Sequence, residues 1–113
     1  MEDIINRNFS QMITLQLSEP EKLIELIHEW DVEHANTDIM GYMGARVLAD
    51  REHVGRYVII VDFGVIDPNV SAAEEAARNN ARPRTQAMAA AAEALADGPP
   101  EFHSYDEIYR TDR

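Results

Sequence analysis

The feature that most constrains the fold is the order in which two hydrophobic patterns alternate along the chain. Residues 10–17 alternate between apolar and polar positions, with Ile13, Leu15 and Leu17 on one side. This period of two predicts a strand with one buried face. A helical period follows over residues 18–36 and begins with a capping sequence. The chain therefore opens with a strand followed by a helix.

The next two predicted elements are strands joined by a short turn. Residues 43–49 alternate again, and residues 51–55 form the turn. Residues 56–65 give the third strand, in which positions 57–61 are apolar without alternation. A strand that is apolar on both sides is typical of one that is buried on both faces.

A broken helix and a last strand complete the chain. A second capping sequence begins at Ser71, and the helical pattern continues to residue 97 with an interruption at Pro83. Proline lacks the amide that a helix interior needs, so we expect a break there. The sequence Gly98-Pro99-Pro100 ends the helix, and residues 102–109 form the last strand.

This order is the β-α-β-β-α-β plan of a ferredoxin-like α+β fold. It predicts a four-stranded antiparallel sheet with two helices on one face, within a single domain over residues 1–113. Two helices cover one face, and the third strand is apolar on both. We therefore expect a homodimer that covers the other face.

The composition of the chain limits the kinds of molecule that it can bind. The chain has 10 basic and 21 acidic residues and a net charge of −11. This balance argues against nucleic acid and against anionic membrane surfaces. No apolar run is long enough to span a bilayer, and the start of the chain lacks the pattern of a signal peptide. We expect a cytoplasmic protein. Cysteine is absent, which excludes thiolate chemistry and disulfides.

Together with the order of elements, two segments of the sequence resemble those of a known group of proteins. They are residues 79–86, with the sequence NNARPRTQ, and residues 97–102, with the sequence DGPPEF. The chain resembles the antibiotic-biosynthesis-monooxygenase-like group of the dimeric α+β-barrel superfamily. The resemblance implies a dimeric barrel and a small-molecule enzyme. Members of the group include cofactor-free monooxygenases, haem-degrading enzymes and proteins without known activity.

The haem-degrading branch is disfavoured. Its members use a histidine in the second helix and a tryptophan on the third strand. Here residues 71–97 contain no histidine, and the third strand carries Phe63 without a tryptophan. We therefore expect no haem and, since no flavin or nicotinamide motif is present, no other cofactor.

The resemblance implies oxidation of a phenol or hydroquinone by dioxygen without a cofactor. The predicted base is His34 or His103, and Trp30 is the predicted apolar wall. The substrate oxygens are assigned to Asn79, Asn80 and Arg82, with Tyr57 as a further contact. The competing interpretations are core packing for Trp30 and His34, and a core or dimer interface for the aromatic residues of the last strand and Tyr57.

Two other clusters have plainer explanations. Arg78, Arg82 and Arg84 form either the rim of an anion site or a surface turn paired with glutamates such as Glu74 or Glu75. Two carboxylate-x-x-histidine spacings on the first helix, ending at His28 and His34, would need further inward carboxylates to bind metal. No such set is visible, so we expect no metal.

The sequence thus supports two functions. The first is an enzyme resembling cofactor-free monooxygenases that act on aromatic, polyketide-like phenols. The alternative is a non-catalytic dimer that binds a small aromatic or anionic ligand or is structural. An enclosed pocket with convergent polar groups favours the enzyme, and a solidly packed interior favours the alternative.

Overall fold

The computed structural model describes residues 7–34, 41–65 and 69–111, and these hold four strands and three helices. In chain order the elements are β1 (Phe9–Gln16), α1 (Pro20–His34), β2 (Tyr42–Ala49), β3 (Arg56–Phe63), α2 (Ala72–Asn80), α3 (Pro83–Leu95) and β4 (Glu101–Asp106).

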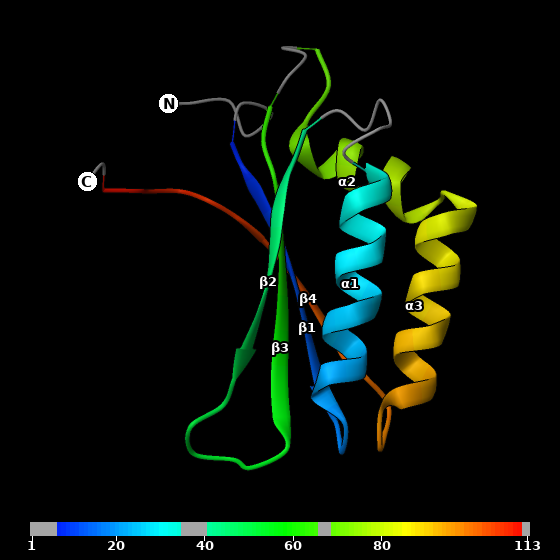
Figure 1. Cartoon of the computed structure of the whole chain (residues 1–113). Coiled ribbons are helices and arrows are strands. Elements are labelled where there is room, and N and C mark those ends of the chain that lie inside the picture. The colour runs from blue at the N-terminus through cyan, green and yellow to red at the C-terminus, as the bar shows by residue number, and fades with distance from the viewer. Residues whose placement is uncertain (1–6, 35–40, 66–68, 112–113) are drawn as a thin grey trace.

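The strands form one antiparallel sheet in the order β2-β3-β1-β4. The helices all lie on one side of it, with α1 and α3 side by side (Figure 1). The predicted ferredoxin-like α+β architecture is confirmed. The strand boundaries differ by at most three residues from those predicted, as is usual for element ends.

The strand register divides the sheet into a covered face and an uncovered face. Leu15 of β1 lies opposite Tyr57, and Ile13 lies opposite Ile59. These residues join the core beneath the helices, together with the fully buried Phe63. The predicted inward direction of Ile13 and Leu15 is confirmed.

The uncovered face carries a different set of side chains. Met12 lies opposite Ile60 on one side and His103 on the other, and Leu48 lies opposite Val58. Ile60 is buried within the sheet surface, whereas Leu48 is 43% exposed. The third strand is thus apolar on both faces, as predicted.

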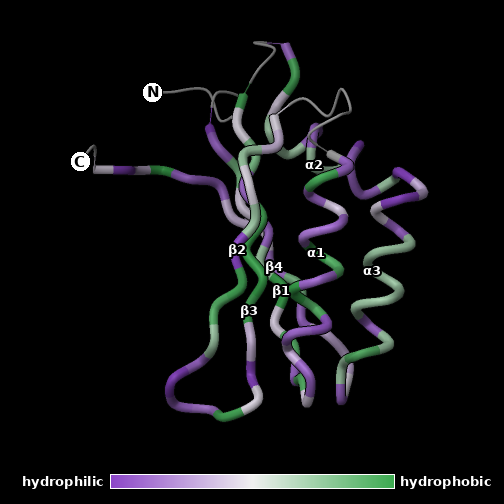
Figure 2. The backbone as a smooth tube through the Cα atoms, viewed as in Figure 1, coloured by the Kyte–Doolittle hydropathy of each residue, from purple (hydrophilic) through white to green (hydrophobic). Residues whose placement is uncertain are grey.

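The second helix is broken where proline was expected to break it. The hydroxyl of Ser71 accepts a hydrogen bond from the Glu74 amide at 3.1 Å, so this predicted cap is confirmed. The helix stops at Asn80, and Arg82 precedes Pro83 at the first position of α3. Alanines give α3 its pale colour along most of its length in Figure 2, whereas α1 alternates between polar and apolar residues.

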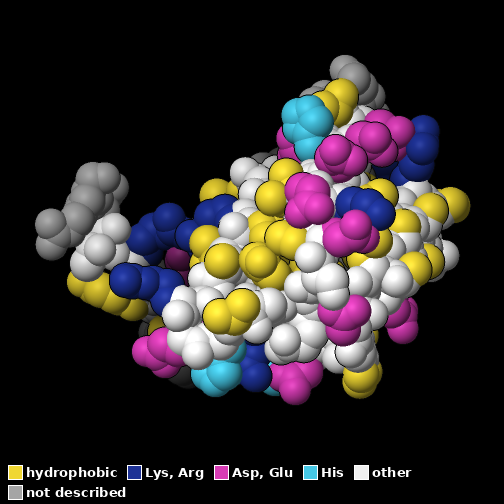
Figure 3. Space-filling view, turned by 60° about the horizontal axis from the view of Figure 1, so that its bottom comes forward, with side chains coloured by type: hydrophobic (Ala, Val, Ile, Leu, Met, Phe, Trp, Pro, Cys, Tyr) yellow, Lys and Arg dark blue, Asp and Glu magenta, His cyan; other side chains and the backbone are white. Residues whose placement is uncertain are grey.

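Hydrophobic side chains also reach the surface. In Figure 3 they gather in the middle of the visible face, and acidic side chains lie along their border. Over the described residues, no helix has both the length and the hydropathy that a membrane span requires.

Candidate small-molecule site

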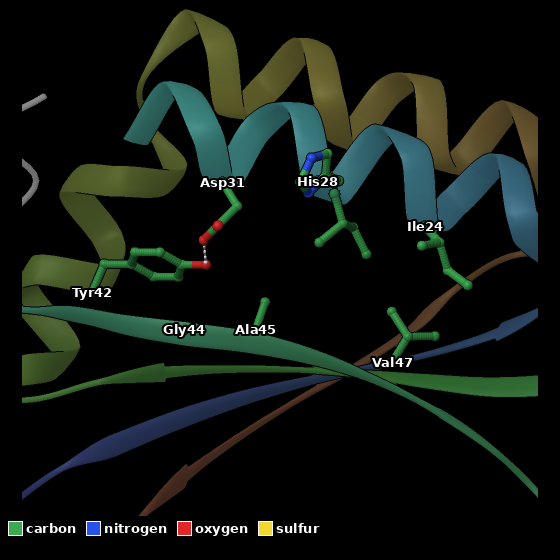
Figure 4. Close-up of a pocket in the computed structure, with 8 residues that line it drawn as sticks. Ile24, His28, Asp31, Tyr42, Gly44, Ala45 and Val47 are labelled. Atoms are coloured by element: carbon green, nitrogen blue, oxygen red, sulfur yellow. Dashed lines mark hydrogen bonds between the residues drawn. The ribbon is translucent and has the colours of Figure 1, made fainter. Parts of the chain in front are cut away.

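An open groove lies between α1 and the edge strand β2. Its volume is about 520 Å³, which is within the range of small-molecule sites. Figure 4 shows Asp31 extending from α1 to the Tyr42 hydroxyl, while the His28 ring lies beside α1. The apolar lining comes from both elements and consists of Ile24, Ile27, Ala45 and Val47.

The polar end of the groove is organised by one hydrogen bond. The Tyr42 hydroxyl donates to Asp31 Oδ1 at 2.7 Å. Burial raises the pKa of Tyr42 well above its ordinary value, and the hydrogen bond to Asp31 and its negative charge raise it further. Tyr42 therefore stays protonated at neutral pH and holds its orientation against the carboxylate.

Local backbone structure places Tyr42 in this position. The register shifts between Tyr42 and Gly44, so the bulge sets Tyr42 opposite Phe63 and Gly44 opposite Asp62. Bulges redirect side chains in this way. Gly44 has a φ of 142°, a region that favours glycine, and it leaves the groove open beside Tyr42. Edge-to-face packing holds the Tyr42 ring against Trp30 at 5.0 Å and against Phe63 at 6.1 Å.

A smaller chamber lies deeper between the helices and the sheet. Its volume is about 90 Å³. Ile27 and Ala45 line both spaces, so these two residues lie between the chamber and the groove. The other lining residues are Ile13, Leu15, Trp30, Ile59, Val61, Met88, Ala89, Ala92, Glu93, Pro100 and Phe102.

A buried chain of hydrogen bonds joins α1 to the helix break. The Trp30 Nε1–H donates to Thr85 Oγ1 at 3.1 Å, and the Thr85 hydroxyl donates to Asn79 Oδ1 at 3.1 Å. All three residues are buried, with exposed fractions of 4%, 6% and 3%. Buried polar groups need such partners. Asn79 therefore links α2 to α3, and Trp30 also lines the chamber. The predicted contact of Trp30 with a substrate stays a prediction.

The arginine cluster makes ion pairs at the surface. Arg84 Nε lies 2.8 Å from Glu33, and Arg78 lies 3.5 Å from Glu75, one of its two expected partners. The second contact is too long for a hydrogen bond, and the buried Glu75 Oε1 has no hydrogen-bond partner among the described residues. Arg82 is half-buried at the start of α3. Its role in ligand binding stays a prediction.

The other predicted residues are dispersed. Asn80 is exposed and donates to Gln11 at 3.4 Å. His103 lies on the uncovered face, so the sheet separates it from the groove. The side chain of His34 is outside the described residues. No group of three or more His, Asp or Glu side chains in the described part of the chain could hold a metal ion.

Tyr57 lies on the opposite face of the sheet from His103 and Tyr105. Tyr57 pairs with Leu15 on the covered face, whereas His103 pairs with Met12 and Tyr105 with Ser10 on the other. A change of one residue in register exchanges the faces. Tyr109 lies beyond the end of β4 and is 79% exposed.

Sequence reasoning missed the groove. His28 and Asp31 had been considered only as possible metal ligands, as members of the two carboxylate-x-x-histidine spacings. Tyr42 was not singled out, because no local pattern shows that a bulge turns it towards α1. The carboxylate–x–x–histidine spacings lie on α1, but Asp31 meets the Tyr42 hydroxyl only through the pairing of β2 with β3.

Comparison with known proteins confirms the predicted fold. The oxygenase SnoaB from Streptomyces nogalater, which is cofactor-independent, aligns at a TM-score of 0.70 and 15% identity, over 96% of this chain and 99% of its own. A protein from Caulobacter crescentus assigned as an antibiotic biosynthesis monooxygenase aligns at 0.71 and 11% identity, over 93% of each chain. A conserved protein from Methanosarcina mazei aligns at 0.69 and 9% identity, over 90% and 94%.

No family model and no curated protein matches the sequence. The evidence from relatives is therefore structural, and at these identities it concerns the fold. The chain has the ferredoxin-like fold of the antibiotic-biosynthesis-monooxygenase-like structures.

Proposed function

We propose that this protein is a cofactor-independent oxygenase that acts on a neutral phenolic aromatic molecule bound between α1 and β2. The observation that carries the proposal is the groove itself. It combines an apolar lining with a bonded carboxylate and hydroxyl at one end and with the His28 imidazole elsewhere in its lining, and it adjoins a chamber that Trp30 lines. Apolar pockets with a few convergent polar groups are typical small-molecule sites.

The charge of the protein favours a neutral ligand. A net charge of −11 repels anions at a distance. A phenol that arrives neutral and loses its proton inside the groove avoids this barrier. In the proposed reaction the imidazole of His28 takes the proton, since an imidazole positioned on a substrate can act as a general base.

Tyr42 has a positioning role in this proposal. Its pKa is raised, so the hydroxyl remains a hydroxyl while the substrate ionises. Asp31 fixes its direction through the 2.7 Å hydrogen bond. The aromatic rings of the substrate would lie on Ile24, Ile27 and Val47, and burial of those rings supplies the binding energy.

The chemistry balances without a cofactor. For anthrone, a tricyclic ketone whose enol is a phenol, the reaction with one dioxygen gives anthraquinone and one water. The carbon opposite the carbonyl loses two hydrogens and gains one oxygen atom. The substrate anion supplies the electrons, and dioxygen is the oxidant. The protein contributes binding, deprotonation and orientation.

The test is oxygen consumption and anthraquinone formation with anthrone as substrate. We expect His28→Gln to lower kcat by about 100-fold, the usual effect of losing a general base. Tyr42→Phe should have a smaller effect. His53→Gln is the matched control, because His53 is exposed in the hairpin between β2 and β3. Equal activity of the His28 and His53 variants would contradict the proposal.

The non-catalytic alternative is favoured by a different observation. The polar groups nearest the chamber bond to each other through Trp30, Thr85 and Asn79, and the chamber itself is apolar. Such a space suits binding without chemistry. Saturable binding of anthraquinone without any anthrone oxidation would identify the protein as a ligand-binding protein without this activity.

A further inference from the structure

We propose that the chamber behind Ile27 and Ala45 holds dioxygen, the second reactant of the proposed oxygenase. This inference rests on the proposed function. The chamber is separate from the groove, and its proposed occupant is a small apolar molecule. The aromatic substrate would occupy the groove, so the two reactants would meet across Ile27 and Ala45.

The first observation in support of a dioxygen site is the apolar lining of the chamber. Of the residues around the chamber, Glu93 is the one with a charge, and it is exposed. The indole nitrogen of Trp30 donates to Thr85. A water molecule needs two to four polar partners to occupy a cavity stably. The aliphatic and aromatic walls do not provide them, so the chamber favours an apolar occupant.

The second observation is the volume of the chamber. A volume of about 90 Å³ exceeds what one water needs, yet it is far smaller than the groove of about 520 Å³. A tricyclic substrate does not fit inside it. A diatomic or monatomic gas does, and a small apolar cavity of this kind is known to bind xenon.

The third observation is the position of the chamber between α3 and the β4 side of the sheet. Ala89 and Ala92 of α3 leave the space open, where a larger residue would fill it. Phe102 of β4 lines it from the other edge of the sheet and is 61% exposed. The chamber can therefore receive a gas from the β4 side while the substrate enters from the β2 side.

Xenon is the probe for the chamber, because it requires no reaction. We expect xenon to shift the methyl NMR signals of Ile13, Ile59 and Met88 of the unmodified protein in a saturable way. Ala92→Leu should abolish these shifts by filling the space, and Ala90→Leu, at an exposed position of the same helix, should preserve them. If Ala92→Leu does not fold, Ala89→Leu narrows the chamber from a more exposed position.

Steady-state kinetics test the identity of the occupant. Ala92→Leu should raise the KM for dioxygen by about tenfold and leave the KM for anthrone unchanged. Absence of saturable xenon shifts, with anthrone oxidation retained, would overturn this inference and leave the proposed function standing. Xenon binding with an unchanged dioxygen KM would also overturn it. Xenon binding without any anthrone oxidation would overturn the proposed function, and the dioxygen assignment with it.

Discussion

The two faces of the sheet differ in how far the chain's own helices cover them. On the covered face, α1 and α3 bury Leu15, Ile59 and Phe63 and leave a groove and a chamber beside them. On the uncovered face, Leu48 and Tyr105 are 43% and 51% exposed, with the buried Ile60 between the strands that carry them. The chain thus forms a groove on one side of its sheet and exposes apolar side chains on the other.

This difference separates two kinds of aromatic and histidine residue. Tyr42 and His28 line a concave space, where a ligand can be surrounded. His103 and Tyr105 lie on a sheet surface, with their rings 6.4 Å apart. The same residue types therefore lie in a concave setting on one face and on an open sheet surface on the other.

The largest effect that we predict is dimerisation through the uncovered face. Apolar side chains over β1, β2 and β3 would otherwise remain in water. We expect a dimer in sedimentation velocity at micromolar concentration. Ile60→Glu would place a charge at the centre of this face and should give a monomer, whereas Ile24→Glu in the groove should not. A stable monomer of the unmodified protein would contradict the prediction.

The next effect concerns the buried link between α1 and the helix break. Thr85→Val removes both hydrogen bonds of the Trp30–Thr85–Asn79 chain. We expect the free energy of unfolding to fall by about 1–3 kcal/mol, the cost of disrupting buried polar partners. Thr85→Ser keeps the hydroxyl and is the control. Chemical denaturation of the two variants measures the difference, and equal stabilities would show that the hydroxyl contributes nothing.

A smaller effect is the pH dependence that Tyr42 gives to stability. Its pKa is higher in the folded than in the unfolded protein. The stabilisation is therefore complete below the ordinary tyrosine pKa and decreases as the pH rises above that value. Of the four tyrosines, Tyr42 should be the last to ionise in an alkaline absorbance titration. The Tyr42→Phe variant should lack that late step, and its persistence would assign it to another tyrosine.

The smallest expected effect is that of Arg82→Ala on binding of an anionic aromatic ligand, because the account places the ligand in the groove and not at the helix break. If the helix break forms the rim of the site, this change weakens binding by about 1.5–3 kcal/mol, the worth of a charge-assisted hydrogen bond. If the groove binds the ligand, we expect little change. Isothermal titration with 1-hydroxy-2-naphthoate compares Arg82→Ala with Tyr42→Phe. A loss of binding affinity in the Arg82 variant alone would show that the ligand binds at the helix break and not in the groove.

The fold was predictable because each of its elements carries a local signal. Strand alternation, the cap at Ser71 and the break at Pro83 depend on neighbouring residues, and the structure contains all three. The dispersal of the predicted site has an equally physical cause. The cluster around Arg82 is conspicuous in sequence, but Arg78 and Arg84 pair with nearby glutamates.

The groove was not predictable, because it depends on contacts between distant parts of the chain. Tyr42 reaches Asp31 through a bulge whose position depends on the pairing of β2 with β3. Likewise, the burial of Asn79 depends on Thr85 and Trp30, which come from two other helices. Hydrophobic periodicity indicates which residues are buried, but it does not indicate which polar residues meet.

The central claim is that the groove between α1 and β2 binds a phenolic aromatic molecule. Amide chemical-shift mapping during titration with 1-naphthol tests it most directly. We predict saturable shifts concentrated at Ile24, His28, Asp31, Gly44 and Ala45, which line the groove. Shifts confined to residues 78–84, or to the uncovered face around Met12 and His103, would contradict the account.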